Sequence, residues 1–242
     1  MGILIQAFNT ILYQPLFNAL VLLYLYLPGH DFGIAVIVLT VIIRIILYPL
    51  MIKSIRSQKI LSDLQPKVQE IQRKYKDDKE KQSKELMALY QKEKINPFGG
   101  CLPPLIQLPI LIALYRVFWK GLQPEAMSML YNFVPNPGAI DPTFLGFINL
   151  AAPSLIFAIL AGITQFFQSK MLMTQKTDGK GDQMGQLSNM MQKQMLYFFP
   201  IFTVFILWRL PSAIGLYWTI TALFSIGQQY LILKPLNKPK NA

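Results

Sequence analysis

The sequence predicts an all-α, polytopic membrane protein with five transmembrane helices, a cytoplasmic helical hairpin and an N-terminal interfacial helix. Hydrophobic residues fill 53% of the 242 positions and the mean hydropathy is +0.37, which is too apolar for a typical soluble domain. The charged residues gather in a few segments, and apolar segments separate them. One cysteine and one histidine leave no internal disulfide and almost no ligands for a metal site, so we expect neither a metal nor another cofactor.

The first apolar segment, residues 3–27, is expected to be an interfacial helix with its lead-in. The first 29 residues contain no charged side chain, a composition that does not fit a secretory signal peptide. Polar residues and a proline interrupt the segment, so its first half fits a helix lying in the membrane surface better than a span. The interrupting residues are Gln6, Asn9, Gln14, Pro15 and Asn18.

The second segment, residues 33–52, is the first predicted span. Its twenty residues suffice to cross a hydrocarbon layer of ~30 Å at ~1.5 Å per helical residue. Arg44, close to the middle, is its single charged residue. On insertion scales, an arginine at that depth costs roughly 2.5–3.5 kcal/mol, so its presence indicates a function.

The basic segment that follows, residues 53–95, is expected to form a helical hairpin. Its apolar residues recur at spacings of three and four, the period of one helix face. Residues 77–79 break the pattern, so we expect two antiparallel helices, with Pro66 kinking the first. Two interpretations remain open: a connector whose apolar residues pack on themselves, or a docking platform for a cytoplasmic partner. The apolar residues are Leu61, Leu64, Val68, Ile71, Tyr75, Leu86, Leu89 and Tyr90.

Four more spans are predicted in the second half of the chain. Prolines inside them are tolerable where neighbouring helices satisfy the freed carbonyl groups. The fourth span is only thirteen residues long, and so short a helix should thin the bilayer around it or tilt little within it. A short basic tail, residues 234–242, closes the sequence. The four spans are residues 98–119, 144–168, 196–208 and 212–233.

The distribution of lysine and arginine predicts the orientation of the spans. Residues 53–94 carry twelve Lys and Arg, residues 121–143 carry none, residues 169–195 carry four and the tail carries three. We therefore expect the N-terminus outside, the C-terminus in the cytoplasm, and basic loops that contact anionic lipids.

The predicted spans contain no Asp or Glu that could pair with Arg44. Thr40, Arg44 and Tyr48 follow at intervals of four and share one helix face. With the predicted topology, the glutamines of the other spans fall in the cytoplasmic half of the membrane. A single hydrophilic groove, wet and open to the cytoplasm, would bring these residues together. The polar residues of the other spans are Gln107, Gln165, Gln168, Thr203, Thr221, Ser225, Gln228 and Gln229.

Several motifs resemble the YidC family of membrane protein insertases. They are NPFGGCLPPLIQLPILIALY at residues 96–115, Arg44 followed by a Tyr-Pro pair, LQPKVQEIQRKYKDDKEK in the hairpin, and PSAIGLYW at residues 211–218. The resemblance extends from about residue 14 to residue 233. It implies a five-span core in a bacterial plasma (inner) membrane, with an arginine in a hydrophilic groove.

The resemblance also implies a function and its partners. It predicts an insertase and chaperone that receives nascent membrane proteins from the ribosome, alone or with the Sec translocon, and has no direct nucleic-acid specificity. Tyr217 and Trp218 are candidates for contacting the apolar segment of a client. An anion channel or transporter remains the alternative use of Arg44. An enzyme is not expected, because the spans contain no paired carboxylates, no metal ligands and no serine beside a base.

Overall fold

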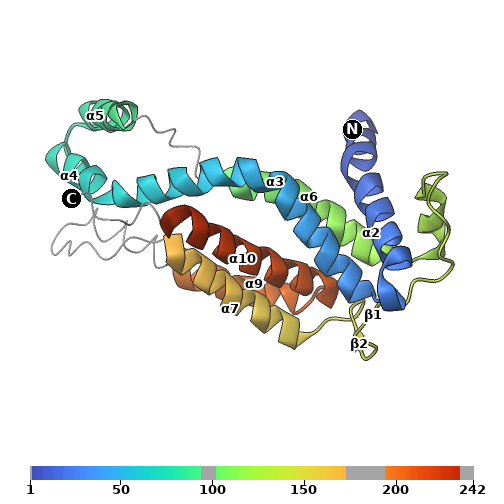
Figure 1. Ribbon diagram of the computed structural model, residues 1–242. Coiled ribbons are helices and arrows are strands. Elements are labelled where there is room, and N and C mark those ends of the chain that lie inside the picture. The colour runs from blue at the N-terminus through green and yellow to red at the C-terminus, as the bar shows by residue number, and fades with distance from the viewer. Residues whose placement is uncertain (1, 94–101, 173–193, 235–242) are drawn as a thin grey trace.

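The computed structural model describes residues 2–93, 102–172 and 194–234 of the chain. Helices run along the length of an elongated molecule, and the only strands of the described residues form one small hairpin. Figure 1 shows a helical hairpin at one end of this bundle, and the N-terminal helix and long loops at the other.

The N-terminal helix is one helical segment in three parts: α1 (Gly2–Phe8), a π-helical turn η1 (Asn9–Tyr13) and α2 (Gln14–Tyr26). Apolar side chains of α2 are buried where this helix packs on α3 and α6. In Figure 1 the segment runs across the bundle rather than along it. Its length and composition also suit a membrane span, so its interfacial position stays a prediction.

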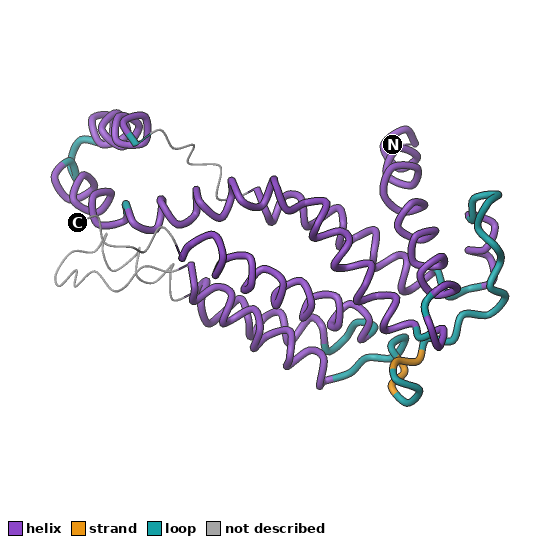
Figure 2. Tube along the Cα trace, in the orientation of Figure 1, coloured by secondary structure: helices purple, strands orange, loops and turns teal. Residues whose placement is uncertain are grey.

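Helix α3 (Phe32–Asp63) is the longest element of the described chain, with 32 residues. At ~1.5 Å per residue it extends about 48 Å, well beyond a hydrocarbon core. Asp31 caps its start, because the carboxylate accepts a hydrogen bond of 2.9 Å from the N–H of Ile34. Pro49 lies inside the helix, which continues past the predicted end of the span. Figure 2 shows the helix as a single long tube.

The hairpin consists of α4 (Gln65–Lys74) and α5 (Lys79–Lys92). The first residues of the predicted hairpin, up to Asp63, belong to α3. The predicted kink at Pro66 is wrong. Pro66 lies in the first turn of α4, where its missing N–H has no helical partner to lose. Asp78 caps α5 by accepting from the N–H of Lys81.

The two hairpin helices pack on each other. Gln82 is buried and donates a hydrogen bond of 2.9 Å to the carbonyl of Gln72. Lys67 on α4 and Glu93 just after α5 form an ion pair of 3.1 Å. Because most basic side chains of the hairpin remain exposed, its outer surface is cationic.

The predicted third span begins later than expected. Residues 143–149 form a two-stranded antiparallel hairpin, β1 (Thr143–Phe144) and β2 (Ile148–Asn149), and helix α7 occupies Leu155–Leu172. Leu145 and Gly146 have positive φ angles of 54° and 77°, which a helix does not contain. Pro153 also disfavours helical backbone just before it.

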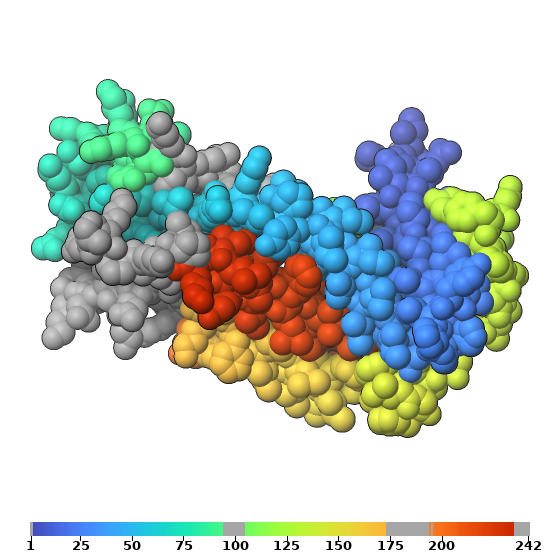
Figure 3. All heavy atoms as spheres, in the orientation of Figure 1, coloured from blue at the N-terminus to red at the C-terminus, as the bar shows by residue number. Residues whose placement is uncertain are grey.

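The remaining helices form the core of the bundle. α6 spans Leu102–Lys120 and is followed by a short 3-10 helix, η4 (Pro124–Met129). A π-helical turn, η5 (Gln194–Phe198), leads into α9 (Phe199–Leu207), and α10 spans Ser212–Leu233. Helix α10 packs against both α3 and α7, and Figure 3 shows it as a red band between them.

The chain is an all-α membrane protein, as the sequence predicts. By length and composition, three described helices suit a membrane span: Gly2–Tyr26, Phe32–Asp63 and Leu155–Leu172, with Leu196–Leu207 as a shorter apolar helix. Helix α10 has 22 residues, and Ser, Thr and Gln side chains interrupt its apolar sequence. Each of the five predicted spans overlaps a helix of the described residues, although residues 98–101 of the second span lie outside them; that all five cross the membrane stays a prediction.

Candidate functional site

Arg44 connects three helices near the centre of the bundle. Its side chain is buried, with 7% of the residue surface exposed. Nη2 donates a hydrogen bond of 3.1 Å to Oε1 of Gln107 on α6. Nε2 of Gln107 in turn donates to the hydroxyl of Tyr217 on α10. The cation is thus fixed by a chain of neutral side chains from α6 and α10.

No carboxylate compensates this buried charge within the described parts of the chain. Arg44 forms no ion pair there, and Gln107 is its only hydrogen-bond partner. A guanidinium has five N–H donors, so most of them lack a protein acceptor. Because a buried cation without an anionic partner is expensive, the arrangement favours water or a transient anion beside Arg44.

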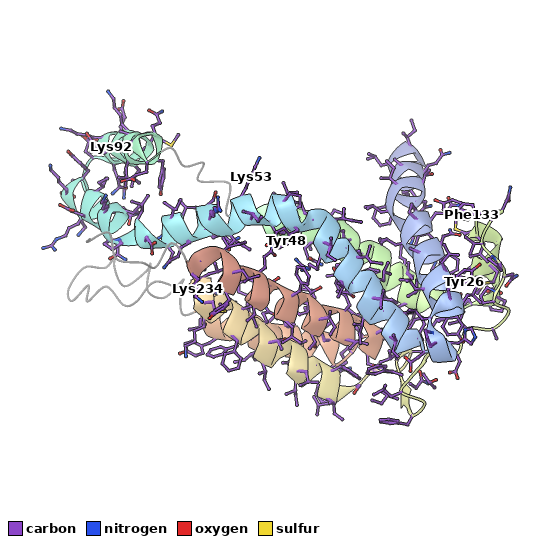
Figure 4. All side chains as sticks on the ribbon, in the orientation of Figure 1. Tyr26, Tyr48, Lys53, Lys92, Phe133 and Lys234 are labelled. Carbon is purple, nitrogen blue, oxygen red and sulfur yellow. The ribbon has the colours of Figure 1, made fainter. Side chains whose placement is uncertain are left out.

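The other predicted polar residues of α3 use their groups within the bundle. Thr40 donates a hydrogen bond of 2.6 Å to the carbonyl of Val36 in its own helix. Tyr48 is half-buried, and its backbone carbonyl lies 3.4 Å from Nε2 of Gln228. Figure 4 shows Tyr48 on the side of α3 that faces α10. Gln228 is buried, and it joins the C-terminal part of α10 to α3.

Tyr217 and Trp218 are consecutive in α10 and face different neighbours, because successive helical residues are ~100° apart. Tyr217 faces Gln107, whereas Nε1 of Trp218 donates a hydrogen bond of 3.0 Å to Oε1 of Gln165 on α7. Thr203 is buried on α9, which packs against α7. The predicted site residues therefore divide between the α3–α6–α10 side and the α7–α9 side of α10.

Three further residues of α10 line its buried surface. Ser225 donates a hydrogen bond of 2.9 Å to the carbonyl of Thr221, so its hydroxyl is satisfied locally. Thr221 itself is buried one helical turn after Tyr217. Gln229 is almost fully buried, and its Oε1 has no hydrogen-bond partner in the described residues.

The sequence interpretation overlooked a second arginine, Arg116 on α6. Its Nη1 donates a hydrogen bond of 2.7 Å to Oδ1 of Asn9, and its guanidinium lies 5.0 Å from the ring centre of Tyr13 and 5.7 Å from that of Phe8. This arginine fixes the N-terminal helix at its π-helical turn. Its position near the end of a span was the available signal, because arginines there anchor helices at the interface.

A buried asparagine, Asn18, was read only as an interruption of an apolar segment. Its amide nitrogen donates to the carbonyls of Gln14 and Met129, and its oxygen accepts from the N–H of Tyr131. It therefore fixes the loop after η4 onto α2. Side chains suited to a metal do not gather anywhere in the described ranges.

Comparison with known proteins gives the family. A family model described as the 60Kd inner membrane protein matches residues 23–240. A protein named membrane protein insertase YidC from Fusobacterium nucleatum is 37% identical over 84% of this chain and 87% of its own length. The chain belongs to the YidC family.

Other YidC proteins agree with this assignment and differ in length. The Clostridium tetani protein is 39% identical over 86% of this chain and 84% of its own length. The Wolinella succinogenes protein is 37% identical over 97% of this chain but only 39% of its own length. A crystal structure of an active YidC insertase matches with a TM-score of 0.58 and 26% identity, covering 94% of this chain and 47% of that one. The chain thus spans most of the shorter YidC relatives and less than half of the longer ones.

Proposed function

We propose that this YidC-family chain inserts membrane proteins into the bilayer, as the names of its relatives indicate for them. It would receive a nascent chain from the cytoplasm, take a short hydrophilic flank across the membrane and release the apolar segment into lipid. The observation that carries this proposal is Arg44, a buried cation held by a neutral glutamine and not by a carboxylate. In this proposal the chain makes and breaks no covalent bonds.

The physical barrier to insertion is the desolvation of polar and charged groups in the client's flank. Water reaching Arg44 from the cytoplasm would shorten the dry part of the path. The guanidinium would attract an acidic residue of the flank for a short time. Because Gln107 binds the cation only through a neutral hydrogen bond, the attraction remains available for a client and weak enough for release.

The groove would use the polar residues that accompany Arg44 on the α3–α6–α10 side. Gln107 and Gln228 bridge helices there, and both could exchange these hydrogen bonds for contacts with a client. We assign Tyr217 and Trp218 to the apolar part of the client. Thr40, Tyr48, Gln165, Thr203, Thr221 and Ser225 complete the proposed lining.

The short fourth span supports a thinned membrane beside the site. Its helical residues in η5 and α9 number fourteen, Gln194 to Leu207, about 21 Å at ~1.5 Å per residue, compared with ~30 Å of hydrocarbon. Thinning there would shorten the distance that a flank must cross.

The proposed orientation places the hairpin in the cytoplasm and the N-terminus outside. Figure 4 shows Lys92 at one end of the molecule, and Tyr26 and Phe133 at the other. The positive-inside rule assigns the lysine-rich end to the cytoplasm. There the exposed lysines of α4 and α5 would meet anionic lipids, the ribosome or the Sec translocon.

One reconstitution tests the proposal against the channel alternative. The purified chain in sealed liposomes should insert a radiolabelled short membrane protein, measured by protection of its translocated flank from protease. The same liposomes should hold an anion gradient. Chloride flux without client insertion would indicate a channel and contradict the proposal.

A further inference from the structure

The turn between β1 and β2 contains a residue that its backbone disfavours. The N–H of Phe147 donates a hydrogen bond of 3.3 Å to the carbonyl of Phe144, and the two residues between them have positive φ angles. This pattern matches a type I′ turn, in which Asn or Asp followed by Gly is preferred. Gly146 fits the pattern, whereas Leu145 does not, because a branched apolar residue is strained at φ 54°.

The hairpin is firmly attached to the start of α3. One carboxylate oxygen of Asp31 accepts from the N–H of Ile34 and caps the helix, and the other accepts from the N–H of Leu145. The ring of Phe144 packs directly on Gly33, where a Cβ atom would overlap it. These contacts hold the strained turn in place. They also fix it to the N-terminus of α3, so the two move together.

The turn presents two apolar side chains outward. Leu145 is 56% exposed and Phe147 is 76% exposed, whereas Phe144 in β1 packs inward against Phe157. Neither outward side chain contributes to the buried core. The strain at Leu145 is not offset by packing of its side chain inside the fold, which indicates that the side chain contacts something outside the protein.

The neighbouring surface identifies that contact as lipid. The turn leads into α7, a helix suited to span a membrane, whose outward face is a continuous row of exposed apolar residues. No charged side chain occurs from residue 142 to residue 169, so the surface suits the glycerol and upper acyl region rather than anionic headgroups. The exposed residues of α7 are Leu155, Ile156, Ile159, Leu160, Ile163 and Phe167.

We propose that Leu145 and Phe147 insert into the bilayer interface beside the N-terminal end of α7. The outer leaflet follows from the proposed orientation of the chain. Through Asp31, this anchor sets the depth of the α3 N-terminus, and therefore the depth of the helix that carries Arg44. The interaction concerns lipid alone and does not require that the chain insert clients.

Nitroxide spin labels in proteoliposomes test the anchor. With Cys101 replaced by serine, single cysteines are placed by Leu145→Cys, Phe147→Cys and, as a control in the same loop, Asn136→Cys. Labels at 145 and 147 should collide more with oxygen, which concentrates in lipid, than with a water-soluble nickel chelate. The label at the exposed position 136 should show the reverse. Greater nickel collision at 147, or low collision with both reagents because protein covers the label, would overturn the proposal.

A second variant separates the anchor from the fold of the hairpin. Leu145→Asn places a preferred residue in the turn and removes the apolar side chain. The label at 147 should then shift toward the nickel reagent, while the helical circular dichroism stays that of the parent. An unchanged collision ratio would show that Leu145 does not hold the turn in lipid. Neither measurement uses client insertion, so this proposal and the proposed function can fail separately.

Discussion

Arg44 Nη2 lies 3.1 Å from Oε1 of Gln107, so an amide on α6 fixes the buried cation of α3. A glutamate of the same shape at position 107 would form an ion pair and satisfy the arginine within the bundle. The amide orients the guanidinium and leaves its charge uncompensated. This difference between Gln and Glu at one position makes the electrostatic account testable.

Gln107→Glu should therefore reduce insertion of clients with acidic flanks. The new carboxylate competes with the client for Arg44, and an interaction on the order of 1–3 kcal/mol in a partly wet site corresponds to roughly a fivefold to hundredfold loss. The measurement is protease protection of radiolabelled clients in proteoliposomes. Gln107→Leu is the control, since it removes the amide without adding a charge. Equal losses in the two variants would show that the amide matters only for packing.

Deleting the hairpin, residues 65–92, with a short linker should leave the membrane-embedded helices folded. Helices α4 and α5 pack on each other, and α4 contacts the end of α3, so the membrane-embedded helices lose few contacts. Client insertion should fall strongly if the hairpin is a receiving platform. Insertion assays and helical circular dichroism on the same preparation check both expectations. A deletion variant that inserts clients at the parental rate would reduce the hairpin to a connector.

Gly33→Ala should destabilise the chain. The added methyl group would overlap the ring and Cβ of Phe144, and such overpacking costs about 1–3 kcal/mol. Gly227→Ala is the matched control on α10, because nothing lies within 4 Å of a Cβ there; it should be neutral or slightly stabilising. Thermal unfolding in detergent compares the two. A Gly33→Ala variant as stable as Gly227→Ala would mean that the β1–β2 hairpin does not pack tightly on α3.

The orientation can be checked with two cysteines in a Cys101→Ser background. A membrane-impermeant thiol reagent added outside cells should label Asn136→Cys and should not label Lys84→Cys. Both positions are exposed in the structure, so the bilayer alone decides which reacts. Labelling of both from outside would contradict the predicted topology, and with it the cytoplasmic opening of the groove.

The sequence predicts the helices well where periodicity and charge agree. The spacing of Val68 and Ile71 and the break at residues 77–79 indicate two hairpin helices, which the structure has as α4 and α5. The start of α7 was missed because residues 144–154 are mostly apolar and carry no charge, and apolar content alone does not distinguish a helix from a short strand. The positive φ at Leu145 had no signal in the sequence, since leucine is not a turn residue.

The candidate site was predictable in its central residue and less so in its partners. Arg44 stands out by charge in an apolar segment, and the lack of Asp and Glu in the predicted spans predicted no ion pair within them, in agreement with the described residues. That Gln107 is the residue beside it, while Gln165 pairs with Trp218, depends on the rotation of α6 and α7 about their axes. Sequence spacing does not fix such rotations, because packing against neighbouring helices sets them.

The central claim is that Arg44 acts through its charge on an acidic flank, and one matched series tests it directly. Clients carrying no, one or two aspartates in the translocated flank are inserted by the parent, Arg44→Lys and Arg44→Ala in proteoliposomes. Arg44→Lys should keep substantial insertion, because an ammonium is still a cation although it lacks the planar donor fork. The loss from Arg44→Ala should grow with each aspartate, by an amount on the order of 1–3 kcal/mol in total. A loss that is the same for all three clients would contradict the electrostatic role of Arg44.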